Sequence, residues 1–234
     1  MQTNFDIAAQ FTSSREGLYQ NNRFDAGNWT SGVMGQGNLV GTMRGISAPV
    51  MVRWLGDASM VTTAVMQAIT EDDFTAIARA LYWRAVNGDQ LPSGVDLLLF
   101  DFAFNSGVAR ASKQLQRVLC LDAPQIDGDI GEDTLEALLH VPANTMAWAL
   151  NDRFRRRLQD DVGVASDGTI GPVTLQAVQA QAARLRVLIY AVASQQEAAY
   201  RSFRGFAQYG GGWLARLNAR VDAAIRLLTA PDWT

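Results

Sequence analysis

Two acidic residues near the beginning of the chain have the chemistry that cleavage of a glycosidic bond requires. Glu16 follows an apolar stretch of helical spacing over residues 5–19, and Gly17 favours the end of a helix there. Asp25 lies nine residues further on. Glycoside hydrolysis uses one protonated carboxyl, which donates to the leaving oxygen, and a second carboxylate or a water held by it. Glu16 is the candidate acid, because partial burial favours the protonated form of a carboxyl.

Asp25 lies in a polar, glycine-rich stretch, residues 20–45, which cannot hold a regular helix. Loops of this length inside a compact domain are usually functional unless they are disordered. The pair of carboxylates is not sufficient evidence by itself, since boundaries between helices and loops collect acidic residues. Asp25 could equally form a turn through bonds to the backbone. Trp29 in the same stretch could stack on a sugar or fix the loop in place.

The elements that must position these residues are predicted to be mainly α-helical, because apolar residues recur at helical spacing along most of the chain. Helices are expected over residues 49–56, after Thr70, where Thr-Glu-Asp-Asp resembles a helix start, and over residues 95–119. Residues 175–228 are expected to be helical apart from a break at residues 210–212, which are three glycines.

One short element occurs twice. Asp127-Gly128-Asp129-Ile130-Gly131 returns 40 residues later as Asp167-Gly168-Thr169-Ile170-Gly171. Each copy is predicted to be a turn that leads into a helix. Two copies are too few for a solenoid, so the interpretation is a paired module or one duplicated turn and helix.

Several classes of site are disfavoured by the single cysteine and the single histidine. Cys120 cannot form a disulfide within the chain, and its apolar surroundings predict a small core residue. His140 alone cannot supply a multi-histidine metal site, and no nucleophile motif accompanies it. No metal or organic cofactor is expected.

The net charge of −3 is unevenly distributed, with 9 basic and 16 acidic residues over 1–145 but 11 basic and 7 acidic over 146–234. An anionic polymer could face the basic part, which includes an arginine cluster at residues 153–157, or the arginines could be solvated. A nucleic-acid partner is not favoured, because the basic surplus is small and lacks interleaved aromatic residues.

Targeting signals are not apparent in the sequence. Residues 1–10 lack the basic start and apolar core of a secretory signal, and no apolar run approaches the roughly 18–20 residues of a membrane span. The expectation is synthesis in the cytoplasm without stable membrane insertion.

A series of short motifs runs along nearly the whole chain. In chain order they are Glu16-Gly17-Leu18-Tyr19 with Asn21, Asp25 and Gly27; Thr42 and Gly45-Ile46-Ser47; Tyr82-Trp83; residues 88–92; residues 100–107; residues 114–117 with the first Asp-Gly-x-Ile-Gly; and Tyr200-Arg201 with residues 212–216. This ordered set resembles the glycoside hydrolase family 108 muramidases. The sequence departs from the family at Leu18, where a second glycine is usual, in the longer stretch between Asp25 and Thr42, and in the second copy of the repeated element.

The resemblance implies a lysozyme-superfamily helical fold, with a catalytic region over residues 1–115 and a helical, peptidoglycan-binding-like region over residues 116–234. The implied reaction is hydrolysis of the linkage between N-acetylmuramic acid and N-acetylglucosamine, as in phage or prophage endolysins. Glu16 would be the general acid, while Asp25 and Thr42 match positions that flank the cleft, where they would hold the water or orient and bind the substrate.

Three further residues are candidates for contact with the sugar. Trp29 and Tyr82 have rings that suit a carbohydrate face, although Tyr82 could also pack in the core or the cleft wall. Asn105 lies four residues after Asp101 on one predicted helix face, where the two could instead form a structural network.

The implied partner is the glycan strand of peptidoglycan, reached in the periplasm through a holin-type membrane lesion or from a virion. Two alternatives stay open at this point. A lytic transglycosylase needs one acid and no attacking water. A non-catalytic, virion-associated wall-binding protein would have lost the reaction and kept the binding.

Overall fold

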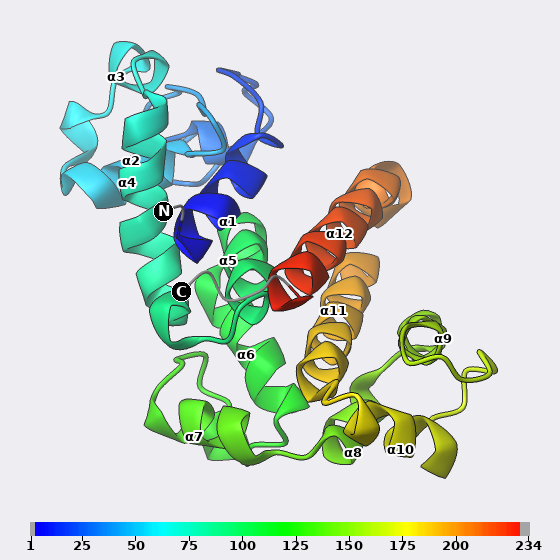
Figure 1. Ribbon diagram of the computed structural model, residues 1–234. Helices are drawn as coiled ribbons and strands as arrows, with labels where there is room; N and C mark the ends of the chain where they lie inside the picture. Colours follow the sequence, from blue (N-terminus) through cyan, green and yellow to red (C-terminus); the bar gives the residue numbers. More distant parts are fainter. Residues whose placement is uncertain (1–2, 230–234) are drawn as a thin grey trace. The chain divides into compact units, whose positions relative to one another are not determined.

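The computed structural model describes residues 3–229, which form helices joined by turns and loops (Figure 1). The mainly α-helical fold predicted from the sequence is confirmed. Over the described residues β-pairing is limited to three isolated bridges, Gln20 with Thr42, Trp29 with Leu39 and Met43 with Ile46. None of the helices within residues 3–229 is both long and apolar enough to cross a membrane.

Helices make up most of the described chain outside residues 14–47. The α-helices are α1 (Asn4–Ser13), α2 (Ala48–Leu55), α3 (Thr63–Gln67), α4 (Glu71–Ala78), α5 (Val95–Ser106), α6 (Val108–Val118), α7 (Glu132–His140), α8 (Ala143–Met146), α9 (Asp152–Asp161), α10 (Pro172–Ala180), α11 (Arg184–Ser202) and α12 (Phe206–Thr229). Short 3-10 helices cover Ala26–Asn28, Ala58–Met60, Arg84–Val86, Gly88–Gln90, Ala123–Gln125 and Ala147–Ala149, and one π-helical turn covers Arg79–Trp83.

The chain divides into two compact units. The first, here called the amino-terminal unit, is residues 9–81, and the second, the helical unit, combines residues 1–8 with residues 82–234. The division between residues 115 and 116 that was predicted from the motifs falls within α6 and stays a prediction about sequence modules.

Local sequence explains how the elements of the amino-terminal unit begin and end. The helix start predicted after Thr70 is confirmed, and there Thr70 and Asp73 form a reciprocal capping box that starts α4. Gly56 ends α2 with a left-handed φ of 77°. Apolar side chains of the unit are buried, among them Val40, Ile46, Met66, Phe74 and Ile77.

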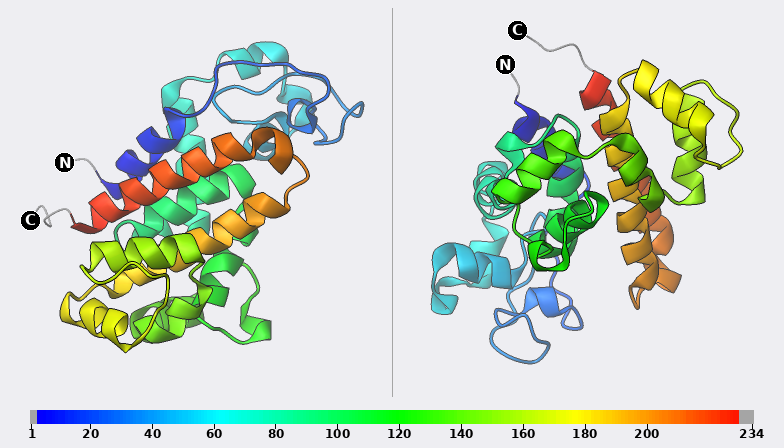
Figure 2. Two further views of the ribbon diagram at one scale, coloured as in Figure 1. Left: turned by 90° about the vertical axis from the view of Figure 1, so that its right-hand side faces the viewer. Right: turned by 90° about the horizontal axis from the view of Figure 1, so that it is seen from below.

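The helical unit is built around α5, which is buried on all sides over residues 95–103. A helix that is apolar all round belongs in a core. Figure 2 shows α11 and α12 running alongside α5, and contacts join all three helices. Phe5 of α1, Trp83 and Phe100 meet edge to face with ring centroids 5.4 to 6.0 Å apart.

The single helix predicted over residues 95–119 is wrong, because the chain breaks at Gly107 into α5 and α6. Gly107 has a φ of 92°, which a residue with a Cβ rarely adopts. The apolar residues keep their helical spacing on both sides of Gly107, so the sequence pattern alone predicted one continuous helix.

A buried ion cluster joins α5 to α11 and α12. Asp101 is fully buried, and it accepts from Arg216 at 2.6 Å and from Arg220 at 2.6 Å. Arg220, also fully buried, donates to the side chains of Gln196 at 2.7 Å and Tyr200 at 3.0 Å. Buried charge is tolerated when it is paired and hydrogen-bonded in this way. Asp101 therefore has a structural network, one of the two predicted roles.

The break predicted at residues 210–212 is wrong, because α12 runs through all three glycines. A glycine costs a helix about 1 kcal/mol relative to alanine. Packing offsets this cost here, since Trp213 stacks on Tyr200 with centroids 5.8 Å apart and contacts Phe203 edge to face. Arg216 and Arg220 then fix the next turns of α12 to Asp101.

The arginine cluster at residues 153–157 is bonded within the helical unit. Arg153 pairs with Glu197 at 3.5 Å, Arg156 with Asp152 at 3.1 Å and Arg157 with Asp222 at 2.5 Å. Arg155 donates through Nε to the carbonyl of Leu150 at 2.9 Å. These arginines connect α9 to α11 and α12, so their charge is partly compensated.

The two Asp-Gly-x-Ile-Gly elements have the same hydrogen-bond framework. In the first, Gln116 of α6 donates to Asp127 Oδ1 (2.8 Å) and to the carbonyl of Asp129 (2.8 Å), and accepts from the amide of Gly128 (3.0 Å). In the second, Gln159 of α9 makes the equivalent three bonds to residues 167–169 at 2.7, 3.0 and 2.8 Å. Each turn leads into a helix, α7 or α10, as predicted.

Cys120 differs from its prediction as a core residue, because its side chain is exposed. It follows α6 with a φ of 58°, and Gly163 holds the corresponding position after α9 with a φ of 72°. Both helices end with a bond to the carbonyl of the framework glutamine, from Leu121 at 3.2 Å and from Val164 at 3.0 Å. Cys120 thus occupies a left-handed helix end that normally favours glycine.

Candidate active site

Glu16 lies directly after α1, on a tight turn. The amide of Arg15 donates to the carbonyl of Thr12 at 3.0 Å, and the amide of Glu16 donates to that of Ser13 at 3.1 Å. The helix ends at Ser13, before the predicted stop at Gly17. The side chain of Glu16 is half-buried, while Gly17 is exposed.

The segment that follows Glu16 pairs with the segment that carries Thr42. The amide of Arg44 donates to the carbonyl of Gly17 at 3.1 Å, and Gln20 and Thr42 exchange two backbone bonds of 2.9 Å. Met43 and Ile46 close a turn whose central residues, Arg44 and Gly45, both have positive φ, as a type I′ turn requires. The Gly-Ile-Ser motif therefore begins in a reverse turn beside the segment that follows the candidate acid.

Close packing fixes this pairing. The Tyr19 hydroxyl donates to the carbonyl of Val40 at 3.0 Å, and its ring lies over Gly41. A Cβ on Gly41 would come within 2.5 Å of that ring, and the φ of Gly41 is 92°. Glycine is therefore required at this position.

Asp25 has both carboxylate oxygens bonded. It is the N-cap of the 3-10 helix Ala26–Asn28, where Oδ1 accepts from the amide of Gly27 at 2.9 Å. Oδ2 accepts from Nε2 of Gln20 at 3.1 Å. The side chain is exposed, and two of the roughly four acceptor positions of a carboxylate are used. A water molecule can bind at those that are left.

A pair of amides connects Asp25 to Thr42. Gln20 and Asn28 exchange two side-chain hydrogen bonds of 2.9 Å, and Asn28 is fully buried. The Thr42 hydroxyl donates to Oδ1 of Asn28 at 2.6 Å. Asp25, Gln20, Asn28 and Thr42 thus form one network. The sequence analysis missed Gln20 and Asn28, because nothing in a stretch crowded with amides distinguishes these two.

Trp29 binds to its own loop. Its indole nitrogen donates to the carbonyl of Arg23 at 3.0 Å, and its backbone pairs with Leu39. The ring is half-buried. This contact corresponds to the loop-fixing role, one of the two roles predicted for Trp29.

An ion pair attaches the turn of residues 43–46 to α4. Arg44 pairs with Glu71 of α4 through a contact of 2.5 Å between Nη1 and Oε2. The Arg44 side chain is 29% exposed and the Glu71 side chain is 53% exposed, so the pair lies near the surface. Such a pair contributes about 0–1 kcal/mol, and it fixes the position of the turn more than it stabilises the fold.

The structure places the predicted residues in both units. Glu16, Asp25, Trp29 and Thr42 belong to the amino-terminal unit, where backbone pairing joins their segments. The other two, Tyr82 and Asn105, belong to the helical unit.

Tyr82 packs on Phe104 with ring centroids 4.9 Å apart. Asn105 is exposed at the end of α5, and its amide donates to the carbonyl of Asp101 at 2.7 Å. Within residues 3–229, no three His, Cys, Asp or Glu side chains are grouped as metal ligands.

Comparison with known proteins gives a family and a related structure. Residues 9–107 match the family Glycosyl hydrolase 108. No curated protein matches the chain. The solved structure of Brucella abortus SagA is 27% identical, with a TM-score of 0.65 over 97% of this chain and 96% of that one. The matched residues begin with the amino-terminal unit and extend through α5. Residues 9–107 are therefore similar to the glycosyl hydrolase 108 family, and the chain has a lysozyme-like helical fold.

Proposed function

We propose that the chain is an N-acetylmuramidase, which hydrolyses the glycan-strand linkage between N-acetylmuramic acid and N-acetylglucosamine with Glu16 as general acid. The family supports a peptidoglycan hydrolase of the muramidase kind. The observation that carries the role of Glu16 is its half-buried position directly after α1, beside the backbone pairing that connects residues 17–20 to residues 42–44.

In the proposed reaction, Glu16 transfers its proton to the glycosidic oxygen as the bond from the anomeric carbon to that oxygen breaks. A water molecule then bonds to the anomeric carbon and passes a proton to the Asp25 carboxylate, so the new reducing end carries the oxygen of water; Asp25 later loses this proton to solvent and Glu16 regains one from solvent. Asp25 orients this water with the acceptor positions that Gly27 and Gln20 leave unused.

Thr42 acts as a positioning residue in this scheme. Its hydroxyl proton is donated to Asn28, which in turn holds Gln20 against Asp25. Trp29, Tyr82 and Asn105 are the proposed contacts to the sugar.

The test is release of soluble muropeptides from purified sacculi by the wild type, Glu16→Gln and Asp25→Asn. We expect Glu16→Gln to lower the rate by at least about 100-fold, the lower end of what general acid catalysis contributes. Product masses should include one added water for each bond broken, whereas a transglycosylase yields anhydro sugars without it. Full activity of a folded Glu16→Gln chain would refute the assigned acid.

We also propose that the enzyme acts in cell lysis as phage or prophage endolysins do, reaching the periplasmic wall after a holin-type lesion. Expression in a Gram-negative host should lower culture turbidity only when the inner membrane is permeabilised at the same time. Lysis without permeabilisation would contradict this role. A wild type that binds sacculi but releases nothing would instead favour the non-catalytic alternative.

A further inference from the structure

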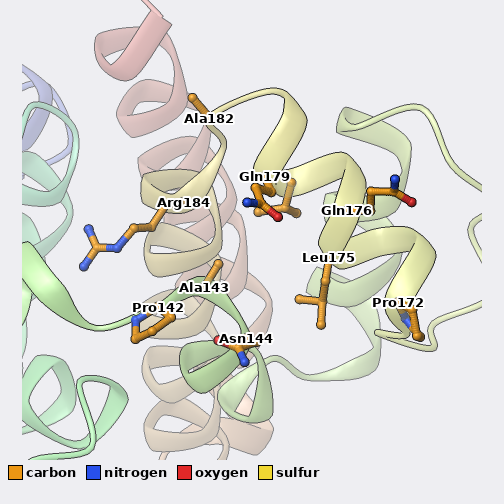
Figure 3. Close-up of a pocket in the computed structure, with 10 residues that line it drawn as sticks. Pro142, Ala143, Asn144, Pro172, Leu175, Gln176, Gln179, Ala182 and Arg184 are labelled. Carbon is orange, nitrogen blue, oxygen red and sulfur yellow. The ribbon is translucent and has the colours of Figure 1, made fainter.

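We propose that a groove on the second copy of the repeated element binds an uncharged stretch of glycan strand. This inference rests on the proposed function, because the polymer it names is the proposed substrate. The groove, here called the α8–α10 groove, lies in the helical unit and has a volume of about 650 Å³. Ligand pockets of roughly 300–1,000 Å³ are typical. In Figure 3, Leu175 and Gln179 of α10 lie opposite Pro142, Ala143 and Asn144.

The lining of the α8–α10 groove combines apolar surface with side-chain amides. Pro142 and Leu175 supply apolar surface, and Asn144, Gln176 and Gln179 supply the amides. Over the described residues these three side chains form no hydrogen bond within the chain. Each amide has two donor hydrogens and one acceptor oxygen, so together they can match hydroxyl and acetamido groups.

The α8–α10 groove has no acidic side chain and one basic side chain in its lining. Arg184 is the one ionisable residue among those that line it, and its guanidinium is already bonded. Nε donates to the carbonyl of Val141 at 2.7 Å, and Nη2 donates to that of Leu138 at 2.6 Å. In Figure 3 this guanidinium points away from α10, so no charged side chain faces the space between α10 and α8. A peptide stem carries carboxylates and ammonium groups, which would lose hydration in that space without an oppositely charged side chain opposite them. The lining therefore suits the glycan better than the stem peptide.

A second pocket of about 410 Å³ extends the α8–α10 groove, since Asn144 and Leu175 line both. Trp148, which is 57% exposed, lies in this extension. Its indole nitrogen donates to Sγ of Cys120 at 3.1 Å, which fixes the ring while leaving much of it accessible. Aromatic faces pack well against the apolar faces of sugars. Arg155 lines the far part of the extension, with Nε bonded to the carbonyl of Leu150.

The first copy offers an internal comparison. Its groove of about 640 Å³ has Asn87 and Gln90 on one side and α7 on the other. The α7 residues are Glu132, Leu135, Glu136 and Leu139, which correspond in the repeat to residues 172, 175, 176 and 179 of α10. Because the hydrogen-bond framework of the turn is the same in both copies, the helix walls of the two grooves differ in side-chain chemistry. Two carboxylates and a leucine in the first copy replace the proline and the two glutamines of the second.

The first experiment is NMR titration of the full-length, ¹⁵N-labelled Glu16→Gln chain with triacetylchitotriose, an uncharged trisaccharide of N-acetylglucosamine. We expect shifts at residues 142–148 and 168–179 and at the Trp148 indole, but none at residues 128–139. The double variant Gln176→Ala with Gln179→Ala should bind about tenfold more weakly at these residues, because it loses two amide contacts.

The matched control is Glu136→Ala with Leu139→Ala, which changes the same helix positions in the first copy and should leave binding unchanged. Alanine favours a helix, and all four residues are exposed, so both variants should fold. A second, independent pair of variants fills the grooves. Leu175→Trp fills the α8–α10 groove and should weaken binding, whereas Leu135→Trp fills the groove of the first copy and should leave binding unchanged.

Three results would overturn the inference: equal weakening in both double variants, shifts confined to residues 9–81, or displacement of the trisaccharide by a charged stem pentapeptide. Muropeptide release by the wild type separates this inference from the proposed function. Release without shifts at the α8–α10 groove refutes the groove alone, while shifts at the groove without release refute the muramidase alone.

Discussion

Asp96 should make the stability of the protein fall as the pH rises from about 4 to about 6. The carboxyl lies in the first turn of α5 and is 1% exposed. Oδ1 accepts from the amides of Gly94 at 2.8 Å and Leu97 at 2.7 Å, and Oδ2 accepts from the Asn4 side chain at 2.8 Å. Loss of hydration on burial outweighs these bonds and raises the pKa of Asp96 from 3.8 to about 6.

The expected magnitude follows from that pKa. The pKa of Asp96 is higher in the folded chain than in the unfolded chain, so the folded chain binds the proton more tightly. The stabilisation of the fold by this proton is therefore complete below about pH 4. It is lost as the pH rises through about 6. A shift of about two pKa units, at about 1.4 kcal/mol each, corresponds to about 3 kcal/mol as an upper value.

The variant Asp96→Asn removes this dependence. An asparagine keeps the Oδ1 acceptor for Gly94 and Leu97, and its amide can donate to Asn4 once the Asn4 amide turns over. We expect Asp96→Asn to match the wild type near pH 4 and to exceed its free energy of unfolding by up to about 3 kcal/mol near pH 7.5.

Urea unfolding of both chains at several values between about pH 4 and pH 8 measures the difference. Asp57→Asn is the control, because the Ser59 contacts lower the pKa of this exposed cap and its contribution is lost as the pH falls. The reasoning is refuted if the stability difference between wild type and Asp96→Asn does not change with pH.

Three further changes test the backbone and the repeat. Cys120→Gly should raise the free energy of unfolding by about 1 kcal/mol, since glycine adopts the positive φ without strain; a lower urea midpoint would contradict this. Gly211→Ala should stabilise the exposed face of α12 by about 0.5–1 kcal/mol, whereas Gly210→Ala should destabilise, because its Cβ would lie 2.7 Å from the ring of Phe206; thermal unfolding compares the two. Gln116→Leu and Gln159→Leu should each cost about 2–3 kcal/mol in chemical unfolding, because each leaves the same buried turn groups without partners, and a clear inequality would mean that the two frameworks are not equivalent.

Features of the fold that depend on neighbouring residues were predictable from the sequence. The helix starts after Thr70 and after the two Asp-Gly-x-Ile-Gly elements depend on residues a few positions apart, and the structure confirms them. The mainly helical class follows from apolar spacing in the same way.

Features that depend on contacts distant in sequence were not predictable. The course of α12 through Gly210 depends on Trp213 and on Asp101, more than 100 residues away, and local propensity indicated a break. Cys120 is exposed because it occupies the left-handed end of a helix. Only the comparison with Gly163, which has the same backbone conformation in the second copy, identifies that helix end. At the candidate site, the sequence singled out Asp25 and Thr42 but not the amide pair that joins them.

The ion cluster at Asp101 has a consequence for the order in which the protein forms during synthesis. Its partners, Arg216 and Arg220, lie 115 and 119 residues further along the chain. At roughly 5–20 residues per second, a ribosome needs about 6–24 seconds to reach them. Until then, burial of α5 would leave the Asp101 carboxylate without its two cations, which costs several kcal/mol and disfavours that burial. The helical unit thus closes after most of the chain has been made. The amino-terminal unit, whose hydrogen-bonded network around Asp25 lies within residues 20–42, can be in place before its larger neighbour is complete.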